Sequence, residues 1–385
     1  MKIPSVLTMI SELIAIPSIS CVNPKEDQSN QAVIELLAHW CQDLGFKVEI
    51  LPVPENSGKF NLVATLGSGD GGLVLSGHTD TVPYDFGAWQ SDPFKLKQAN
   101  DRLYGLGTAD MKAFFALALT AAAQFSADSL TKPLIILATA DEETSMSGAR
   151  ALAAAGYPKA RHSIIGEPTA LRPVRMHKGI FMECIKLHGL SGHSSDPSLG
   201  NSALEGMYLV IEELRKWRTE LQTHYNNPFF AVPIPTMNLG HIHGGDNPNR
   251  ICANCELHLD LRPLPGMAIE ELRAILRERV TNTLKDSGLK VEFIPLFQGI
   301  EAIETPAEAE IVQIAERLTN YSAESVAFAT EAPYLKDLGM DTIILGPGNI
   351  AQAHQPDEFI TLKSLQPMID ILTQMIRQLT IPTTL

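Results

Sequence analysis

The sequence predicts an α/β protein with a mainly parallel sheet in a larger, discontinuous domain, into which a smaller α+β domain is inserted. Residues 1–175 alternate short, continuous apolar runs with helical patterns, as buried parallel strands and their covering helices do. Residues 176–291 carry strands in which apolar and polar residues alternate, which is typical of an antiparallel sheet with one exposed face. The first texture returns over residues 292–385. We therefore expect the larger domain at 1–175 and 292–385, and the inserted domain at 176–291.

The periodicity of the first part predicts its elements in order. A helix is expected over 29–44, where apolar residues recur at helical spacing and end before Gly45. Met111–Phe125 is rich in Ala, Leu and Phe and predicts a helix with little exposed surface, and a further helix is expected near 147–155. Strands are predicted at the remaining apolar runs, which are Lys47–Leu51, Asn61–Leu66, Leu73–Gly77, Leu134–Ala138 and Ser163–Gly166.

The same periodic patterns predict the helices and strands in the rest of the chain. The inserted domain has two predicted helices, at about 202–221 and 268–286. Its alternating strands are predicted at Phe181–His188, Thr236–Ile242 and Cys252–Leu261. The returning part has a helix near 307–319, a buried strand at Thr342–Leu345 and a last helix at about 364–379.

Composition excludes several classes of partner. The chain has 385 residues and a formal net charge of −14 at pH 7, whereas nucleic acids and anionic membranes bind basic patches. No apolar stretch approaches the roughly 18 residues of a membrane span. The start, Met1–Pro4, is not followed by the apolar core and small-residue cleavage site of a signal peptide. The five cysteines are scattered and odd in number, as in a reducing compartment, so we expect a cytoplasmic protein.

Two motifs of the inserted domain resemble metal sites, and we interpret both as structural. Cys252 and Cys255 form a C-x-x-C pair, but they lie on a predicted strand, where residues three apart point to opposite faces. His241 and His243 share one face of a predicted strand, but no carboxylate cluster accompanies them in the sequence.

Acidic and imidazole side chains follow the buried strands of the larger domain. His78 and Asp80 come after the strand at 73–77, and Asp110 precedes the helix that begins near Met111. The other members of the set, which also follow predicted strands, are Asp141, Glu142, Glu143, Glu167 and His354. In open α/β sheets, ligands bind at the carboxyl ends of the strands. Five separate segments are therefore expected to meet at one edge of the sheet.

So many carboxylates repel one another unless cations lie between them. Imidazoles and carboxylates suit zinc, and also cobalt or manganese. The expected ligands of two Zn²⁺ ions per chain are His78, Asp110, Glu143, Glu167 and His354. Asp80 stands where it can fix the tautomer of His78, and Glu142 is left to act as the base for a metal-activated water.

Four segments carry a resemblance to a known family. They are Ser76–Pro83, Leu103–Lys112, Ala140–Thr144 and Gly166–Pro168, and they resemble the zinc aminoacylase and carboxypeptidase family. The resemblance extends over nearly the whole chain. The resemblance implies that Asp110 bridges two zinc ions, that His78 and Glu167 complete one site, and that His354 and Glu143 complete the other. It also implies Glu142 as general base and acid, Asp80 behind His78, and a cis peptide between Asp110 and Met111.

Further segments resemble one branch of that family. They are Ala138–Ser145, Asn238–Asp246, Asp260–Met267, Thr330–Pro333 and Gln352–Glu358. This likeness implies hydrolysis of the acetyl group of N2-acetylornithine and a homodimer formed through the inserted domain. It implies that His193, in Ser191–Ser195, reaches the partner's active site as a catalytic oxyanion donor, with Asn249 nearby.

Substrate binding is predicted from side-chain chemistry. Arg262 suits a bidentate contact with the α-carboxylate, and Lys178 is a second candidate for it. Glu331, with Thr330 before it, is the candidate partner of the δ-ammonium group.

Other functions stay open at this point. A desuccinylase or a broad N-acyl-amino-acid hydrolase of the same family is the nearest alternative. A metal-dependent phosphoesterase is a second alternative, but the sequence has neither the Gly-rich phosphate loop nor the arginine cluster expected of one. A non-catalytic dimeric scaffold would not need Glu142 and a full ligand set.

Overall fold

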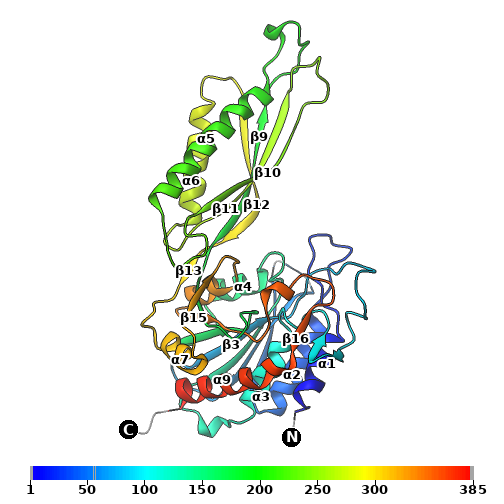
Figure 1. Ribbon diagram of the computed structural model, residues 1–385, viewed down its shortest axis with the longest axis vertical. Coiled ribbons are helices and arrows are strands. Elements are labelled where there is room, and N and C mark those ends of the chain that lie inside the picture. The colour runs from blue at the N-terminus through cyan, green and yellow to red at the C-terminus, as the bar shows by residue number, and fades with distance from the viewer. Residues whose placement is uncertain (1–2, 55, 57, 382–385) are drawn as a thin grey trace. The chain divides into compact units, whose positions relative to one another are not determined.

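The computed structural model describes residues 3–54, 56 and 58–381, so Met1 and Lys2, which begin the stretch considered for a signal peptide, lie outside it. The chain forms two compact units. The larger unit comprises the chain up to Arg175, Thr305–Glu324 and the chain from Thr330 onward. The smaller unit comprises Met176–Glu304 and Ser325–Ala329. Figure 1 traces both units along the chain.

The larger unit is built on a mainly parallel sheet, as predicted. Its strand order is β1-β2-β6-β3-β7-β15-β8, in which β6, β3, β7 and β15 run parallel and β1, β2 and β8 pair antiparallel at the sides. The bounds are β1 Lys47–Pro52, β2 Phe60–Leu66, β3 Leu73–His78, β6 Leu134–Thr139, β7 His162–Ile165, β8 Val174–His177 and β15 Asp341–Ile344.

Helices cover this sheet, and its strands are buried on both faces as a result. The helices are α1 Val6–Ile14, α2 Gln31–Asp43, α3 Ala113–Ala122, α4 Ser147–Ala155, α7 Glu310–Thr319, α8 Ala332–Asp337 and α9 Leu362–Thr380. Leu75 and Ile136 pack in one core with α1, α2, α3, α7 and α9, while their strand neighbours Val74 and Ile135 are buried as well. No helix within 3–54, 56 and 58–381 is long and apolar enough to cross a membrane.

A small three-stranded sheet, β16-β5-β4, stands apart from the main one. It consists of β4 Lys97–Ala99, β5 Arg102–Tyr104 and β16 Phe359–Thr361. Phe359 pairs with Tyr104, so the chain just before β16 lies beside the loop that leads from β5 to α3. That loop contains Asp110, and the pairing therefore helps to build the site. The sequence did not reveal these three short strands.

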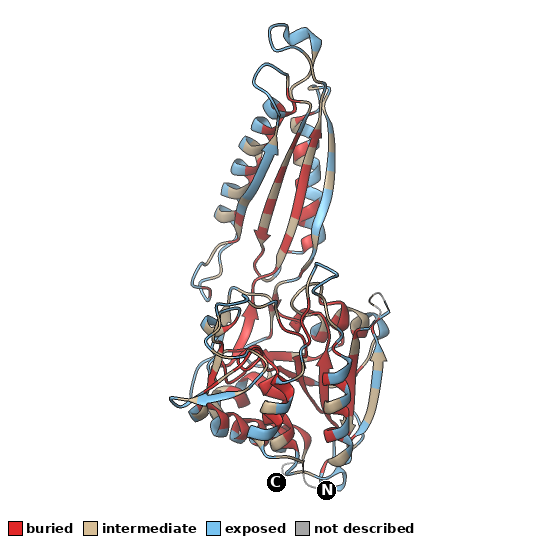
Figure 2. Cartoon of the chain, turned by 90° about the vertical axis from the view of Figure 1, so that its right-hand side faces the viewer, coloured by how far each residue is buried: buried red, intermediate tan, exposed pale blue. Residues whose placement is uncertain are grey.

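The smaller unit has an antiparallel sheet of strand order β10-β11-β9-β12. The strands are β9 Ile180–His188, β10 Thr236–Gly244, β11 Asn254–Arg262 and β12 Lys290–Ile300. Helices α5 (Ala203–His224) and α6 (Ile269–Thr283) lie together along one face (Figure 1). Ser202 caps α5 by accepting a hydrogen bond from the backbone N–H of Glu205. Figure 2 shows these helices buried toward the sheet and exposed on their outer sides.

The expected return to the larger domain at 292 falls inside β12, which pairs with β9. The smaller unit accordingly extends to Glu304. The short strands β13 (Ile303–Glu304) and β14 (Glu324–Val326) lie where the chain passes from one unit to the other. Single turns of 3-10 helix complete the structure, at Ala127–Ser129, Pro197–Leu199 and Ile350–Gln352.

Candidate metal centre

The polar residues predicted at the strand ends lie together in the larger unit. His78 is the last residue of β3, Glu142 and Glu143 follow β6, and Glu167 follows β7. Asp110 comes from the loop before α3, and His354 from the chain after β15. The site is tightly built, because a Cβ on Gly166, just before Glu167, would overlap the ring of Phe114. Glycine at this position lets α3 pack against the strand end.

Asp110 is the centre of this arrangement. Its Oδ1 lies 3.0 Å from Nε2 of His78, and its Oδ2 lies 3.5 Å from Nε2 of His354. Nε2 of His78 is also 3.6 Å from Oε1 of Glu167, and Nε2 of His354 is 3.0 Å from Oε2 of Glu143. Two groups of three ligand atoms, each within 4.8 Å of one another, therefore share Asp110. Imidazole and carboxylate donors in two such groups suit a pair of divalent ions.

The electrostatics of the cluster agree with a cation site. Burial raises the pKa of Glu142, Glu143 and Glu167, and neighbouring carboxylates raise it further because negative charges repel one another. Hydrogen bonds to Asp110 and Glu143 raise the pKa of His354 to about 10. Burial alone would lower the pKa of His78, but its carboxylate neighbours raise it well above its usual range. The carboxylates thus favour positive charge at the positions between them.

Asp80 fixes both a ligand and the turn beside it. Its backbone oxygen lies 3.0 Å from Nδ1 of His78, which leaves Nε2 of that ring to face Asp110. The Asp80 carboxylate is 3.6 Å from the same Nδ1 and accepts hydrogen bonds from the backbone N–H groups of Glu142 (3.2 Å) and Glu143 (3.1 Å). Asp80 therefore holds the base candidate and a ligand candidate as well as the imidazole.

The turn after β6 is anchored by Asp141, which has a positive φ of 59°. Its carboxylate accepts hydrogen bonds from the hydroxyls of Ser20 and Ser147, and it lies 2.8 Å from Nζ of Lys59. Lys59 is 2% exposed and also pairs with Asp27. This buried ion network sets the position from which Glu142 and Glu143 project.

Glu358 is a positioning residue that the sequence did not reveal. Its carboxylate accepts hydrogen bonds from the backbone N–H groups of Gly107 (3.0 Å), Ala109 (2.7 Å) and Asp110 (3.0 Å). Burial raises the pKa of Glu358 to about 8, although these donors lower it. It stands just before β16 rather than after a buried strand, so only the pairing of β16 with β5 shows its place.

Replacing Glu358 with alanine is expected to weaken metal binding by about 10–100-fold, the usual cost of removing a residue that orients a ligand. The loop would lose three hydrogen bonds, and Asp110 its fixed orientation. Metal titration monitored by calorimetry measures the affinity. Asp357→Asn is the matched control, because Asp357 accepts a hydrogen bond from the backbone N–H of Gln90 instead. Unchanged affinity in Glu358→Ala would contradict the positioning role.

The residues predicted to bind substrate have different surroundings. Glu331 is buried, and its Oε2 accepts a hydrogen bond from the hydroxyl of Thr139 at 2.7 Å. Its Oε1 is buried and finds no hydrogen-bond partner in the described part of the chain. The hydroxyl of Thr330 accepts a hydrogen bond from the backbone N–H of Ala332. In the smaller unit, Lys178 donates to the backbone oxygen of Ile234, and Arg262 pairs with Asp260 through Nε and Nη2.

His193 lies in an exposed loop of the smaller unit with a defined tautomer. Its Nδ1 accepts a hydrogen bond from the backbone N–H of Ser195 at 3.2 Å. The ring proton of the neutral imidazole is therefore on Nε2, which is left as a donor. The backbone oxygen of Asn249 accepts a hydrogen bond from the N–H of Ser194, so Asn249 adjoins this loop.

The prediction that the C-x-x-C cysteines lie on one strand and point to opposite faces is wrong, because β11 begins at Asn254 and Cys252 and Cys255 both lie in the core of the smaller unit. Their burial still favours a structural pair. Cys255 lies in the core of the smaller unit, and burial raises the pKa of its thiol to about 11. The thiol of Cys252 donates to the backbone oxygen of Asn254.

The predicted cis peptide between Asp110 and Met111 is present.

The carboxylates and imidazoles at the strand ends of this mainly parallel sheet are suited to a metal-dependent hydrolase. The sequence model of "Peptidase family M20/M25/M40" matches residues 74–378, and the chain belongs to this family. The chain is similar to the acetylornithine deacetylase of Proteus mirabilis (strain HI4320), with 50% identity over 375 residues that cover 97% of each chain. It is an amide hydrolase.

Solved structures show the same fold. The M20 family metallo-carboxypeptidase Sso-CP2 from Sulfolobus solfataricus has a TM-score of 0.74 at 17% identity, covering 97% of this chain and 99% of that one. The YXEP protein of Bacillus subtilis, described as a dinuclear metal-binding peptidase of the M20 family, has a TM-score of 0.68 at 14% identity and covers 97% of each chain. At these identities the likeness concerns the fold alone.

Proposed function

We propose that this enzyme removes the acetyl group from N2-acetyl-L-ornithine, giving L-ornithine and acetate for arginine biosynthesis, with two Zn²⁺ ions per chain. Cobalt or manganese could substitute for zinc. The observation that carries the proposal is the placement of Asp110, whose two oxygens face two different histidines. Each histidine also approaches a glutamate of its own, Glu167 for His78 and Glu143 for His354. The substrate follows the name of the relative that is 50% identical.

The bound ions and Glu142 are proposed to perform different steps of the reaction. Two divalent ions, when bound, supply a water of lowered pKa and a Lewis acid for the acetyl carbonyl. Glu142 accepts the proton of the attacking water and delivers it to the departing amine, which is otherwise a poor leaving group. Two observations support this role. Glu142 lies beside His78 and Glu143, and burial raises the pKa of its carboxyl, which favours the uptake of a proton.

The oxyanion is proposed to receive a hydrogen bond from His193 of the other subunit of a homodimer formed through the smaller unit. The tautomer supports this role, because Nε2 of His193 is a donor that Ser195 does not use. Exposed apolar residues of α5, which are Leu204, Tyr208 and Leu209, support a subunit contact there. Strand β10 lies at the side of its sheet, and its exposed Ile242 favours the same conclusion.

Glu331 is the proposed partner of the substrate's δ-ammonium group. A buried carboxylate oxygen without a hydrogen-bond partner is unfavourable, and an ammonium group would satisfy it. Thr330 is proposed to shape the same region. For the α-carboxylate we retain Arg262, through the Nη1 edge that Asp260 does not take, together with Lys178 and Asn249.

Replacing Glu331 with glutamine is expected to lower kcat/KM for N2-acetylornithine. The corresponding loss of transition-state stabilisation is roughly 1.5–3 kcal/mol, the range for hydrogen bonds to charged groups. The amide oxygen of glutamine can still accept from Thr139, so the fold should persist. N-acetylmethionine, which has no ammonium group, is the control and should lose little. Because burial raises the pKa of Glu331 to about 7, KM for acetylornithine in the unmodified enzyme should rise as the pH falls below that value. Equal losses on both substrates would make Glu331 structural.

The proposed function is tested by comparing kcat/KM for N2-acetylornithine, N-acetylmethionine and N-succinyl-diaminopimelate with zinc and with cobalt. We expect acetylornithine to be hydrolysed fastest with either metal. A preference for the succinyl substrate would identify a desuccinylase. Similar rates on the two acetyl substrates would identify a broad acylamino-acid hydrolase. The cytoplasm remains the proposed location, supported by five free cysteines.

A further inference from the structure

The open face of the smaller unit's sheet carries an unusual set of side chains. Helices α5 and α6 cover the face formed by residues such as Ile185, Leu257 and Leu259. Side chains alternate along a strand, so their neighbours Cys184 on β9 and Glu256 and His258 on β11 point to the other face. His241 of β10 joins them, because it pairs directly with His258.

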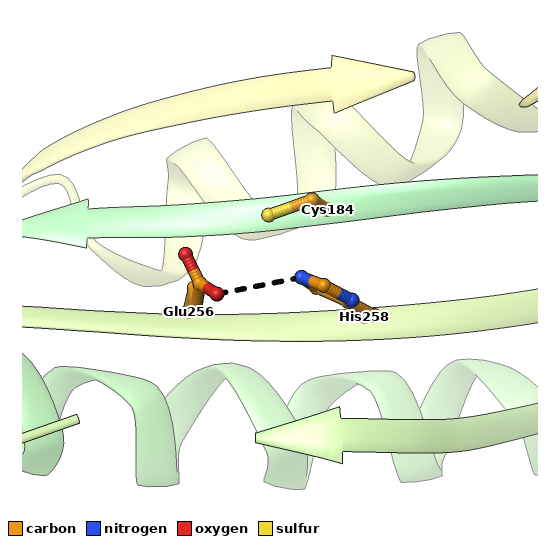
Figure 3. A group of neighbouring side chains, drawn as sticks. All are labelled: Cys184, Glu256 and His258. Atoms are coloured by element: carbon orange, nitrogen blue, oxygen red, sulfur yellow. Dashed lines mark ion pairs between the residues drawn. The ribbon is translucent and has the colours of Figure 1, made fainter. Parts of the chain in front are cut away.

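Strand register brings these groups into contact. Cys184 pairs directly with His258, and Glu256 is the next residue of β11 on the same face. One ligand atom from each of these three residues lies within 4.8 Å of the others. Figure 3 shows the three side chains, with the ion pair between Glu256 and His258 drawn as a dashed line. Oε1 of Glu256 is 3.6 Å from Nε2 of His258 and 3.7 Å from Nε2 of His241. The rings of the two histidines are 4.5 Å apart.

We propose that Cys184, Glu256, His258 and His241 bind a further divalent transition-metal ion of the zinc class, separate from the strand-end centre. Zinc bond lengths of about 2.0–2.3 Å give tetrahedral ligand-to-ligand distances of about 3.3–3.8 Å. The two distances from Glu256 to the histidines already fall in this range. A thiolate, two imidazoles and one carboxylate are suitable donors for zinc or cobalt and poor ones for magnesium or calcium.

The alternative is a cross-strand ion pair without a metal. In that case one oxygen, Oε1 of Glu256, would face two imidazole nitrogens at 3.6 and 3.7 Å, and both distances are longer than a hydrogen bond. Lys186 lies on the other oxygen of the carboxylate, with Nζ 3.8 Å from Oε2, so Glu256 already has one cation. A metal ion instead uses both neutral imidazoles and the thiolate. It would also connect β9, β10 and β11, and so stabilise the smaller unit.

Cobalt distinguishes this site from the strand-end centre, because the proposed ligands there include no cysteine. Full-length enzyme titrated with Co²⁺ should develop the near-ultraviolet charge-transfer absorption of a cobalt–thiolate bond. Cys184→Ser should lose this absorption and still hydrolyse acetylornithine at the normal rate. Cys252→Ser is the matched control, since Cys252 is another buried thiol of the same unit, and it should keep the absorption. Circular dichroism checks that each variant is folded.

A second variant tests the exposed ligand. The His241 side chain is 50% exposed, so His241→Gln should fold normally and weaken cobalt binding at the thiolate by at least about tenfold. No thiolate absorption at saturating cobalt, an absorption that persists in Cys184→Ser, or one that disappears in Cys252→Ser would overturn the proposal. Each of these results leaves the acetylornithine assay unaffected, so this site and the proposed function are tested separately.

Discussion

Replacing Glu142 with glutamine is expected to lower kcat at least ~10²-fold while both metal ions stay bound, which is the usual size of a general-base contribution. Glutamine keeps the shape of the side chain, and the backbone N–H of residue 142 can still donate to Asp80. What is lost is the ability to take a proton from water and to pass it to the amine. Steady-state kinetics and elemental analysis of the same preparation measure both quantities.

The neighbouring residue provides the control for this experiment. Glu143→Gln should weaken metal binding, because Glu143 contacts His354 at 3.0 Å and shares a ligand group with Asp110. The two adjacent glutamates are thus expected to differ in kind, one affecting the rate and the other the metal content. Loss of metal from Glu142→Gln would show that Glu142 is a ligand, and the assignment of the base would be wrong.

Removing His193 is expected to lower kcat by about 10²–10³-fold with unchanged metal content, as for loss of one oxyanion donor. The His193 side chain is exposed and bonds to Ser195 through Nδ1, so His193→Ala should not disturb the fold. His224→Ala is the control, because His224 is an exposed histidine of the same unit whose Nδ1 contacts the backbone of its own helix. Its rate should be normal.

Mixing inactive subunits shows whether His193 acts across a dimer. Chains with Glu142→Gln are combined with chains with His193→Ala and allowed to exchange. If His193 serves the partner's site, the mixed dimer has one site with both lesions and one with neither, so up to half of normal activity returns. If it serves its own chain, every site keeps one lesion. Proven exchange without any recovery would refute action across the dimer.

Local sequence predicted the elements that have strong periodicity. Strands such as β3 and β6 are entirely buried and were visible as continuous apolar runs, and α4 was predicted at its observed bounds. The strand ends could be located for the same reason, and with them His78, Glu143 and Glu167. The structure brings these residues together at one edge, because the strands before them are parallel neighbours.

Contacts set by pairing between distant strands could not be predicted. Glu358 meets the loop of Asp110 only because β16 pairs with β5, and each of these strands has three residues. The sequence near His241 shows no carboxylate cluster, yet Glu256 of β11 lies 3.7 Å away, because β10 and β11 pair there after a register shift between Leu239 and His241. For Arg262 a signal existed: Asp260 is two residues before it on the same strand face, where the two side chains pair.

Metal content tests the bridged arrangement around Asp110 most directly. Elemental analysis should be made on the Cys184→Ser enzyme, so that only the strand-end centre is counted. We expect two ions per chain, loss of both in the Asp110→Ala variant of that enzyme, and loss of one in its Glu167→Ala variant, because Asp110 faces both histidines and Glu167 faces His78. A single tight ion in the parent enzyme, or Asp110→Ala that retains one ion while Glu167→Ala retains both, would contradict the account.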